Sequence, residues 1–346
     1  MTTVLRTLLT IAISIAGGYV VNLTGLPAGW LMGGALAVAV AGVAGAPLAM
    51  PGWLRDVTFV FTGMSMGASV TRDSLALILQ WPITLAALVI ELVLIVGVTG
   101  YMLRKVFGID RGTAYLSSFP GHLSFVMGIA AAGVGDPRQI TIIQVIRILM
   151  LTTAVPIGAL FLPVGHDVHM ATAQPAAGWL NLGLILIICA ATGLVFQRLR
   201  VPAAFALGAM AASITTKFTG LFEGAMPADM LVAIYVMVGA LIGSRFAGIT
   251  FAEFRAAATG GLIATVLTIA IVTAVAYGAS TFVDMPFGQI WLGLSPGALE
   301  GMGVLGIALG FDTAFIAAHH VARLLMLTVA IPVVALLVRD KERAKE

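Results

Sequence analysis

Apolar residues in this chain fall into long segments that are separated by short polar ones. Most segments approach the length of about 20 residues that an α-helix needs to cross a bilayer, which predicts an all-α protein. The predicted segments lie at about 3–22, 27–45, 53–71, 81–103, 111–134 and 137–162, and then at 178–197, 202–220, 228–246, 256–281, 287–310 and 313–338.

The second six segments repeat the first six. A shift of 176 residues places Ser117–His122 over Gly293–Ala298 and aligns Leu149–Thr152 with an identical Leu325–Thr328. The same shift places Arg147 on Arg323 and Pro156 on Pro332. Matches of this kind inside apolar segments indicate a duplication. We therefore divide the chain into a first repeat (1–162), an external linker (163–177), a second repeat (178–338) and a basic cytoplasmic tail (339–346).

Composition changes this picture from a helical protein to a membrane protein. Apolar residues make up 60% of the chain and charged residues only 10%, against about 45–50% and 25% in soluble domains. The 40 glycines lie inside the apolar segments, as is typical of packed transmembrane helices. The net charge of +3 comes from loops and the tail, so it reports orientation in the bilayer and not a nucleic-acid partner.

The fifth segment of each half contains a Pro-Gly pair that breaks a helix, at Pro120-Gly121 and at Pro296-Gly297. Nine residues separate Arg111 from Pro120. A helix of that length spans about 14 Å, which is half of the hydrocarbon thickness. Each fifth segment is therefore either a broken crossing or a re-entrant hairpin.

The distribution of Lys and Arg favours hairpins. With hairpins, each half has five crossings, the two halves are inverted, both termini are cytoplasmic, and only Arg72 and Lys217 lie on the external side of the membrane. The cytoplasmic cations are then Arg6, Arg55, Arg104, Lys105, Arg111, Arg138, Arg198, Arg200, Arg245, Arg255 and the tail. We predict two inverted repeats, each with five transmembrane helices and one re-entrant hairpin.

The third helix of each half carries glycines four residues apart, Gly63 and Gly67 in the first and Gly239 and Gly243 in the second. This spacing favours the close approach of another helix. Because the pattern recurs in both halves, it also indicates that the two helices surround the same kind of feature.

Ionisable residues inside the apolar segments are few, and each costs about 2.5–3.5 kcal/mol at a helix centre. They are Glu91, His122, Arg147, Glu300, His319, His320 and Arg323. Arg147 and Arg323 both fall about ten residues into the sixth helices, so they reach the bilayer midplane from opposite sides.

The hairpin breaks reach the same depth, where their free backbone N–H and C=O groups can bind a polar ligand. Guanidinium groups bind carboxylate, sulfonate or phosphate through two hydrogen bonds, so the midplane is a candidate site for a small anion. The candidate binding residues are Ser117, Ser118, Pro120, Gly121, His122, Arg147, Ser295, Pro296, Gly297 and Arg323. In the alternative, Arg147 pairs with Glu91 and Arg323 with Glu300, and these ion pairs hold helices together.

Three residues are candidates for coupling to H⁺ or Na⁺: Glu300, His320 and Gln144. Glu300 has no acidic counterpart, because Ser124 occupies the equivalent position, so it is either an ion-linked group or a partner of Arg323. His320 replaces Gln144 of the first half, so it is either a proton carrier or a hydrogen-bonded packing residue.

No catalytic motif is present in the sequence: no Walker loop, no HExxH, no GxSxG and no Cys/His cluster with ligand spacing. The single cysteine, Cys189, can form no intrachain disulfide. We predict that the chain is not an enzyme and has no cofactor, metal ion or nucleic-acid partner.

The motifs SSFPGH and LSPGALEGM in the fifth segments, with QVIRILMLTTAVP and HHVARLLMLTVAIP in the sixth, resemble the AbrB-type integral-membrane family of bacteria over nearly the whole chain. More distantly, inverted five-helix repeats with broken elements resemble the sodium/proton antiporters, the bile-acid carriers and the glutamate and citrate carriers. That resemblance implies an elevator, in which the hairpins and sixth helices move against a scaffold that is often dimeric.

Three function classes remain in competition. A secondary transporter of a small organic anion accounts for the repeat, the broken helices and the midplane charges together. A membrane sensor or regulatory component would use the same site without moving its ligand. A membrane-bound enzyme is the third class.

Overall fold

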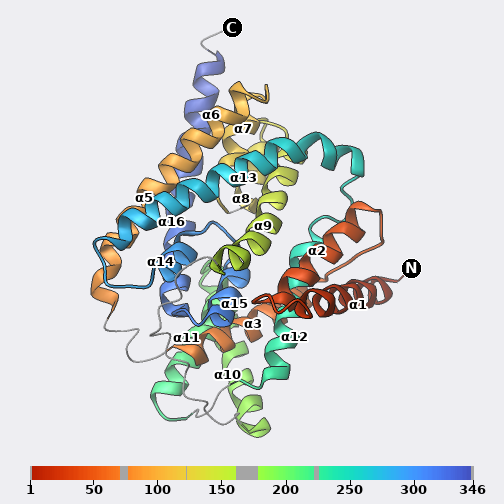
Figure 1. Ribbon diagram of the computed structural model, residues 1–346, viewed down its shortest axis with the longest axis vertical. Coiled ribbons are helices and arrows are strands. Elements are labelled where there is room, and N and C mark those ends of the chain that lie inside the picture. Colours follow the sequence, from red (N-terminus) through yellow and green to blue (C-terminus); the bar gives the residue numbers. More distant parts are fainter. Residues whose placement is uncertain (1, 71–76, 122, 161–177, 222–225, 344–346) are drawn as a thin grey trace. The chain divides into compact units, whose positions relative to one another are not determined.

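The computed structural model describes residues 2–70, 77–121, 123–160, 178–221 and 226–343, and every regular element in these ranges is a helix (Figure 1). Six of these helices are long and apolar enough to cross a membrane: Thr3–Asn22, Trp81–Lys105, Pro137–Gly158, Trp179–Arg198, Phe251–Ser280 and Thr313–Val338. The predicted all-helical, multi-pass membrane protein is confirmed. The predicted linker, residues 163–177, lies outside the described residues.

The chain forms two compact units, and each unit contains segments from both halves of the duplicated sequence. The first unit consists of residues 1–79, 152–248 and 299–318. The second unit consists of residues 80–151, 249–298 and 319–346. The sixth helices, α9 (Pro137–Ala159) and α16 (Thr313–Arg343), continue from one unit into the other.

The first unit is built from the first three helices of each half. It also contains the helix that follows the break in the fifth segment of the second half. Its helices are α1 (Thr3–Asn22), α2 (Gly29–Val43), α3 (Gly52–Ser69), α10 (Trp179–Arg198), α11 (Ala204–Phe218), α12 (Ala228–Ser244) and α15 (Leu299–Leu309). Helix α1 packs against α2, and α10 packs in the same way against α11. The third helix of each half then packs against the second helix of the other half, α3 against α11 and α12 against α2.

The two halves also share an unusual backbone conformation. Ala28 and Ala203 immediately precede α2 and α11, and both adopt left-handed backbone angles, with φ of 55° and 49°. Residues with a Cβ atom rarely adopt this conformation. Its occurrence at corresponding positions, each directly after a proline, indicates that the repeated sequence has kept a repeated backbone.

The glycines of the third helices bring backbones into contact, as their spacing predicts. A Cβ atom on Gly63 would overlap the carbonyl oxygen of Ala206 in α11. A Cβ atom on Gly239 would lie 2.8 Å from the carbonyl oxygen of Leu31 in α2. Because these contacts leave no room for a side chain, the glycines set the distance between the paired helices.

The second unit contains the remaining helices. They are α5 (Trp81–Leu94), the π-helix η2 (Ile95–Thr99), α6 (Gly100–Lys105), α7 (Arg111–Ser118), α8 (Leu123–Ala131), α13 (Phe251–Ser280) and α14 (Phe287–Leu294), and a short 3₁₀-helix, η1 (Leu77–Gln80), precedes α5. Helix α13 runs alongside α5, η2 and α6 and also contacts α14 (Figure 1).

Both fifth segments are broken where the Pro-Gly pairs predict. Helix α7 ends at Ser118 and α8 begins at Leu123, while α14 ends at Leu294 and α15 begins at Leu299. Proline removes a backbone donor and clashes with the preceding turn, so a helix cannot continue through it undistorted. Gly121 adopts a φ of 120°, which a residue with a side chain rarely does.

Two element boundaries differ from the prediction by about five residues. Helix α13 begins at Phe251, about five residues earlier than predicted, because Thr250 and Glu253 form a capping box at its start. Residues 339–343, predicted as a separate tail, continue α16. No helix breaker separates these charged residues from the apolar part of the helix.

We expect Gly63→Ala to destabilise the protein. The added methyl group meets a backbone oxygen that cannot rotate away, and overpacking of this kind costs about 1–3 kcal/mol. Thermal unfolding in detergent measures the effect. Gly183→Ala in α10 is the matched control because its added methyl group meets no atom, so its melting temperature should be unchanged or higher. Equal melting temperatures of the two variants would contradict the packing role of Gly63.

Candidate functional site

The Arg147 side chain in α9 binds the end of a broken helix. Its Nη1 donates to the carbonyl oxygens of Ser117 (3.3 Å) and Ser118 (3.4 Å), and its Nη2 donates to that of Phe119 (2.7 Å). These are the last carbonyls of α7 and the first of the break, so the arginine caps the C-terminus of α7.

Arg323 in α16 makes the equivalent set of bonds. Its Nη2 donates to the carbonyl oxygens of Gly293 (3.1 Å) and Leu294, and its Nη1 donates to that of Ser295 (2.9 Å). Under the shift of 176 residues these three acceptors correspond one by one to those of Arg147. The duplication has therefore preserved a specific interaction in addition to the helices.

The chemistry of a helix end explains why arginine suits this position. The last carbonyl oxygens of a helix receive no hydrogen bond from within the helix, and inside a membrane no water is present to donate one. They also carry the negative end of the helix dipole, about half a unit of charge, which a cation stabilises. A planar guanidinium supplies several donors at fixed angles, so one side chain can serve three carbonyls.

The two guanidinium groups lie in the second unit, close enough to repel each other electrostatically. Arg147 is 4% exposed and Arg323 is 2% exposed. The Nε of each arginine is buried without a hydrogen-bond partner, as is the hydroxyl of Ser117. Buried polar atoms without partners are uncommon in native proteins. Three of them around one pair of cations mark this region as a candidate binding site.

The remaining residues predicted at the breaks have local structural roles. The Ser118 hydroxyl donates to the Ala114 carbonyl oxygen (2.8 Å), and the Ser295 hydroxyl donates to that of Trp291 (2.7 Å). Pro120 and Pro296 are buried within the two breaks, next to Gly121 and Gly297. His122 lies outside the described residues.

Gln144 and His320 occupy equivalent positions one turn before the two arginines. The Gln144 side chain donates through Nε2 to the Leu116 carbonyl oxygen (3.2 Å), which adds a further bond to the end of α7. His320 is buried. The neighbouring His319 ring lies 2.7 Å from the Thr84 hydroxyl of α5 and edge-on to Trp81.

The predicted acidic residues have different environments. In the first unit, the Glu300 carboxylate of α15 pairs with the Arg245 guanidinium of α12 at 3.2 Å. In the second unit, Glu91 is 0% exposed and neither carboxylate oxygen has a hydrogen-bond partner. Within the described residues Glu91 makes no ion pair with Arg147, and the cation that interacts with it electrostatically is Arg323.

The sequence holds a signal for these environments, of which the prediction used only the unmatched Glu300 and not the unmatched Arg245 or Glu91. Arg245 aligns with Ser69 and Glu300 aligns with Ser124, so the two charges that pair are both absent from the first half. Glu91 aligns with Leu267, so this acid also lacks a counterpart. Unmatched charges in a duplicated membrane protein therefore identify the residues in which the two halves differ chemically.

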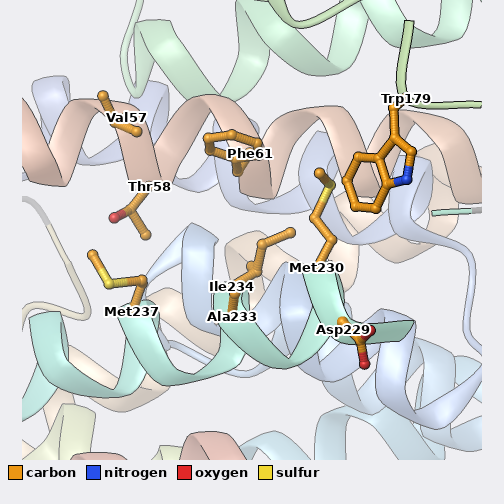
Figure 2. Close-up of a pocket in the computed structure, with 9 residues that line it drawn as sticks. All are labelled: Val57, Thr58, Phe61, Trp179, Asp229, Met230, Ala233, Ile234 and Met237. Atoms are coloured by element: carbon orange, nitrogen blue, oxygen red, sulfur yellow. The ribbon is translucent and has the colours of Figure 1, made fainter. Parts of the chain in front are cut away.

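An apolar cavity of about 400 Å³ lies in the first unit between α3, α10 and α12. Figure 2 shows the side chains that line it: Val57, Thr58, Phe61, Trp179, Asp229, Met230, Ala233, Ile234 and Met237. Among the described residues that line this cavity there is no cation, and the charged one, Asp229, would repel an anion. The cavity is thus unsuited to the ligand that the arginines favour.

No group of three or more His, Cys, Asp or Glu side chains that could hold a metal ion occurs in the described ranges. Cys189 is buried, and its thiol lies 3.3 Å from the Ala209 carbonyl oxygen.

Comparison with known proteins places the chain in a family. Residues 30–339 match the family described as "Transition state regulatory protein AbrB". The chain belongs to the AbrB family. Its helical, membrane-type structure agrees with the membrane family that the fifth and sixth segments resemble, so that resemblance is confirmed.

Two relatives illustrate the extent of the similarity within the AbrB family. One is "Uncharacterized protein YhjN" of Bacillus subtilis (strain 168), which is 24% identical over 95% of this chain and 92% of its own length. Another is "Putative regulator AbrB" of Escherichia coli (strain K12), which is 25% identical over 90% of each chain. Both alignments cover nearly the full length, so the two repeats are matched together.

We expect Arg147→Lys to lower the free energy of unfolding. A single ammonium group cannot reproduce the planar fork that serves three carbonyls, and leaving buried carbonyls unpaired costs about 1–3 kcal/mol. Thermal unfolding of the purified protein measures the loss. Arg138→Lys is the matched control on the same helix. Arg138 is exposed and pairs with Glu253 at the surface, where a change of this kind costs about 0.5 kcal/mol or less. Equal destabilisation by the two variants would mean that Arg147 does not cap α7.

Proposed function

We propose that this AbrB-family chain is a secondary active transporter of a small organic anion. The observation that carries the proposal is the pair of repeat-related arginines, each fully inside a membrane helix and each at the end of a broken helix. A structural cap alone needs no second cation nearby. Two buried guanidinium groups of like charge are costly in a bilayer, and an anion bound between them would offset part of that cost.

The chemistry of the site favours a carboxylate, sulfonate or phosphate group. The Nη atoms of each guanidinium donate to backbone carbonyls, whereas its Nε has no hydrogen-bond partner. The Ser117 hydroxyl is a further donor without a partner. An anion that bridges the two arginines would accept from these groups and would reduce their repulsion. The ligand would therefore contribute to the stability of the protein as well as occupy the site.

A re-entrant arrangement of the first fifth segment is supported by a contact between its two ends. The Asp136 backbone N–H, just after α8, donates to the Thr113 hydroxyl in the first turn of α7 (2.6 Å). A segment whose start and end meet enters and leaves on the same side of a membrane. With five crossings and one hairpin, the two halves are inverted and both termini are cytoplasmic.

The proposed mechanism is alternating access at a single site. The two arginines come from helices that reach the midplane from opposite sides, so one site can be exposed to either side in turn. We propose the elevator form of this movement, in which the hairpins and sixth helices move against a scaffold. The distant resemblance to antiporters and the duplication support it. Coupling to H⁺ or Na⁺, a location in the bacterial inner membrane and a homodimer belong to the same proposal.

A regulatory role is the second candidate, and the names of the family and of its Escherichia coli relative favour it. In that role the arginine pair would bind the same anion and transmit its binding without transport. We propose neither an enzymatic activity nor a cofactor for either role.

We expect the purified protein to be stabilised by small organic anions and not by neutral analogues. A ligand at about 100 times its dissociation constant stabilises by about 2.7 kcal/mol, which a thermal-shift screen over carboxylates, sulfonates, amino acids and sulfate would detect. Arg323→Lys should lose the shift, whereas Arg138→Lys should retain it.

Uptake into proteoliposomes distinguishes the two functions. A transporter accumulates a radiolabelled form of the anion that gives the largest shift, and a regulator binds it without accumulation. If no anion shifts the melting temperature and Arg323→Lys matches the wild type, the proposed binding site is wrong.

We expect a cysteine at position 284 to react with a membrane-impermeant reagent in intact cells. Asp284 lies in an exposed loop, and the hairpin topology places that loop outside the cytoplasm. Arg198→Cys, at the exposed end of α10, should react only after permeabilisation. The native Cys189 is buried, so its background labelling should be low. Labelling of position 284 only after permeabilisation would contradict the hairpin topology.

A further inference from the structure

Glu91 is a buried acid of the second unit, and the proposed anion site gives it no role. It lies in α5, it is 0% exposed, and both of its carboxylate oxygens are without hydrogen-bond partners. An ionised carboxylate in such a place is costly unless a cation lies close to it. The π-helix η2 begins four residues later, and irregular turns of this type occur frequently at functional sites.

A hydrogen bond between α5 and α16 positions this acid. The Thr84 hydroxyl of α5 lies 2.7 Å from the His319 ring of α16. Glu91 lies two turns after Thr84 on the same face of α5, and Arg323 lies one turn after His319 on α16. The two helix faces therefore bring Glu91 towards Arg323, which agrees with their electrostatic interaction.

Among the described residues, the elements in contact with α5 carry few ionisable side chains. Helix α14 contains no ionisable side chain. In α13 the ionisable residues are Glu253 and Arg255 in the first turns and Tyr277 near the end. Beyond η2, those of α6 are Tyr101, Arg104 and Lys105. In α16 the ionisable residues nearest in sequence to the Thr84 contact are His319, His320 and Arg323.

The charge balance of the site depends on the protonation of this one acid. Each arginine lies at a helix C-terminus that contributes about half a negative charge, and the N-terminus of α8 contributes about half a positive charge. With Glu91 ionised, these groups leave little net positive charge to attract an anion. With Glu91 protonated, the site gains one full unit of positive charge.

We infer that Glu91 is the protonatable group of the arginine site and takes up a proton when a small anion binds to Arg147 and Arg323. The inference rests on the proposed anion site and assigns its coupling ion as H⁺. Without the anion, burial favours the protonated form of Glu91 and the positive charge of Arg323 favours the ionised form, so we infer that Arg323 keeps part of the population ionised. A bound anion becomes the counter-ion of Arg323 and repels the carboxylate, so the carboxylate accepts a proton from water. By thermodynamic reciprocity, protonation of Glu91 strengthens anion binding, so proton and anion move together.

Infrared difference spectroscopy of the purified protein tests the titration of Glu91 without any ligand. On acidification, a buried carboxyl without hydrogen bonds gives a C=O band that is distinct from the bands of carboxyls in water. We expect this band in the wild type and in Glu300→Gln, the matched control whose carboxylate is paired with Arg245. We expect its complete loss in Glu91→Gln and in Glu91→Leu, which restores the residue of the second half. A band that persists in both Glu91 variants would overturn the inference.

Addition of potassium acetate, potassium succinate or potassium sulfate to weakly buffered protein tests the linkage. Each salt that raises the melting temperature should also raise the pH of the solution, because Glu91 takes up protons. Glu91→Gln should keep the thermal shift and lose the proton uptake, and Glu300→Gln should keep both. A salt that stabilises the wild type without proton uptake, or with uptake that persists in Glu91→Gln, would overturn the inference. If none of the three salts stabilises the protein, the anion proposal fails for these ligands, while the infrared band still decides whether Glu91 titrates.

Discussion

The need to satisfy backbone carbonyls inside a membrane underlies the whole of the candidate site. A proline in the fifth segment ends a helix at a depth where water is absent, and the freed carbonyls must then be bonded within the protein. Arg147 and Arg323 perform this task in the two halves with the same three acceptors. A cation buried for this reason is also a cation held inside the protein with its orientation fixed. The structural requirement of the broken helix thus creates the electrostatic condition for binding an anion, and the cap and the site are two properties of one interaction.

The close packing of the first unit depends on the same duplication. Since Gly63 and Gly239 bring backbones together at corresponding crossings, each half completes the packing of the other, and neither half buries its third helix against its own second helix alone. Packing of this kind, between helices of different halves, depends on backbone contact. In lipid the fit between helix surfaces contributes more to helix association than hydrophobicity does, because lipid is as apolar as the side chains. Glycines such as Gly63, Gly67, Gly239 and Gly243 lie at contacts between helices, where they permit close approach.

The helices themselves were largely predictable, because length, apolar composition and helix breakers act locally. The break at Pro120 and the start of α9 at Pro137 follow from the sequence alone. The partners of the buried charges were not predictable in this way, since a side chain in the bilayer can pair with any polar group that the fold brings near it. Sequence reasoning supplied carboxylates as partners for Arg147 and left out backbone carbonyls, which carry no residue-type signal. The one sequence signal for the ion pair between Glu300 and Arg245 was that both charges occur in the second half and have no charged counterpart in the first.

The asymmetry between the halves then has a physical meaning. If the two repeats were chemically identical, the site would carry two cations in every state, and its affinity for an anion would not depend on any other ion. Replacement of an apolar residue, which the second half retains as Leu267, by Glu91 adds one group whose charge can change. Its burial beside Arg323 means that this change alters the charge of the whole site by one unit in a medium that screens it poorly. Under the proposed function, the duplicated scaffold would supply alternating access through its symmetry, and the single unmatched carboxylate would link anion binding to a proton.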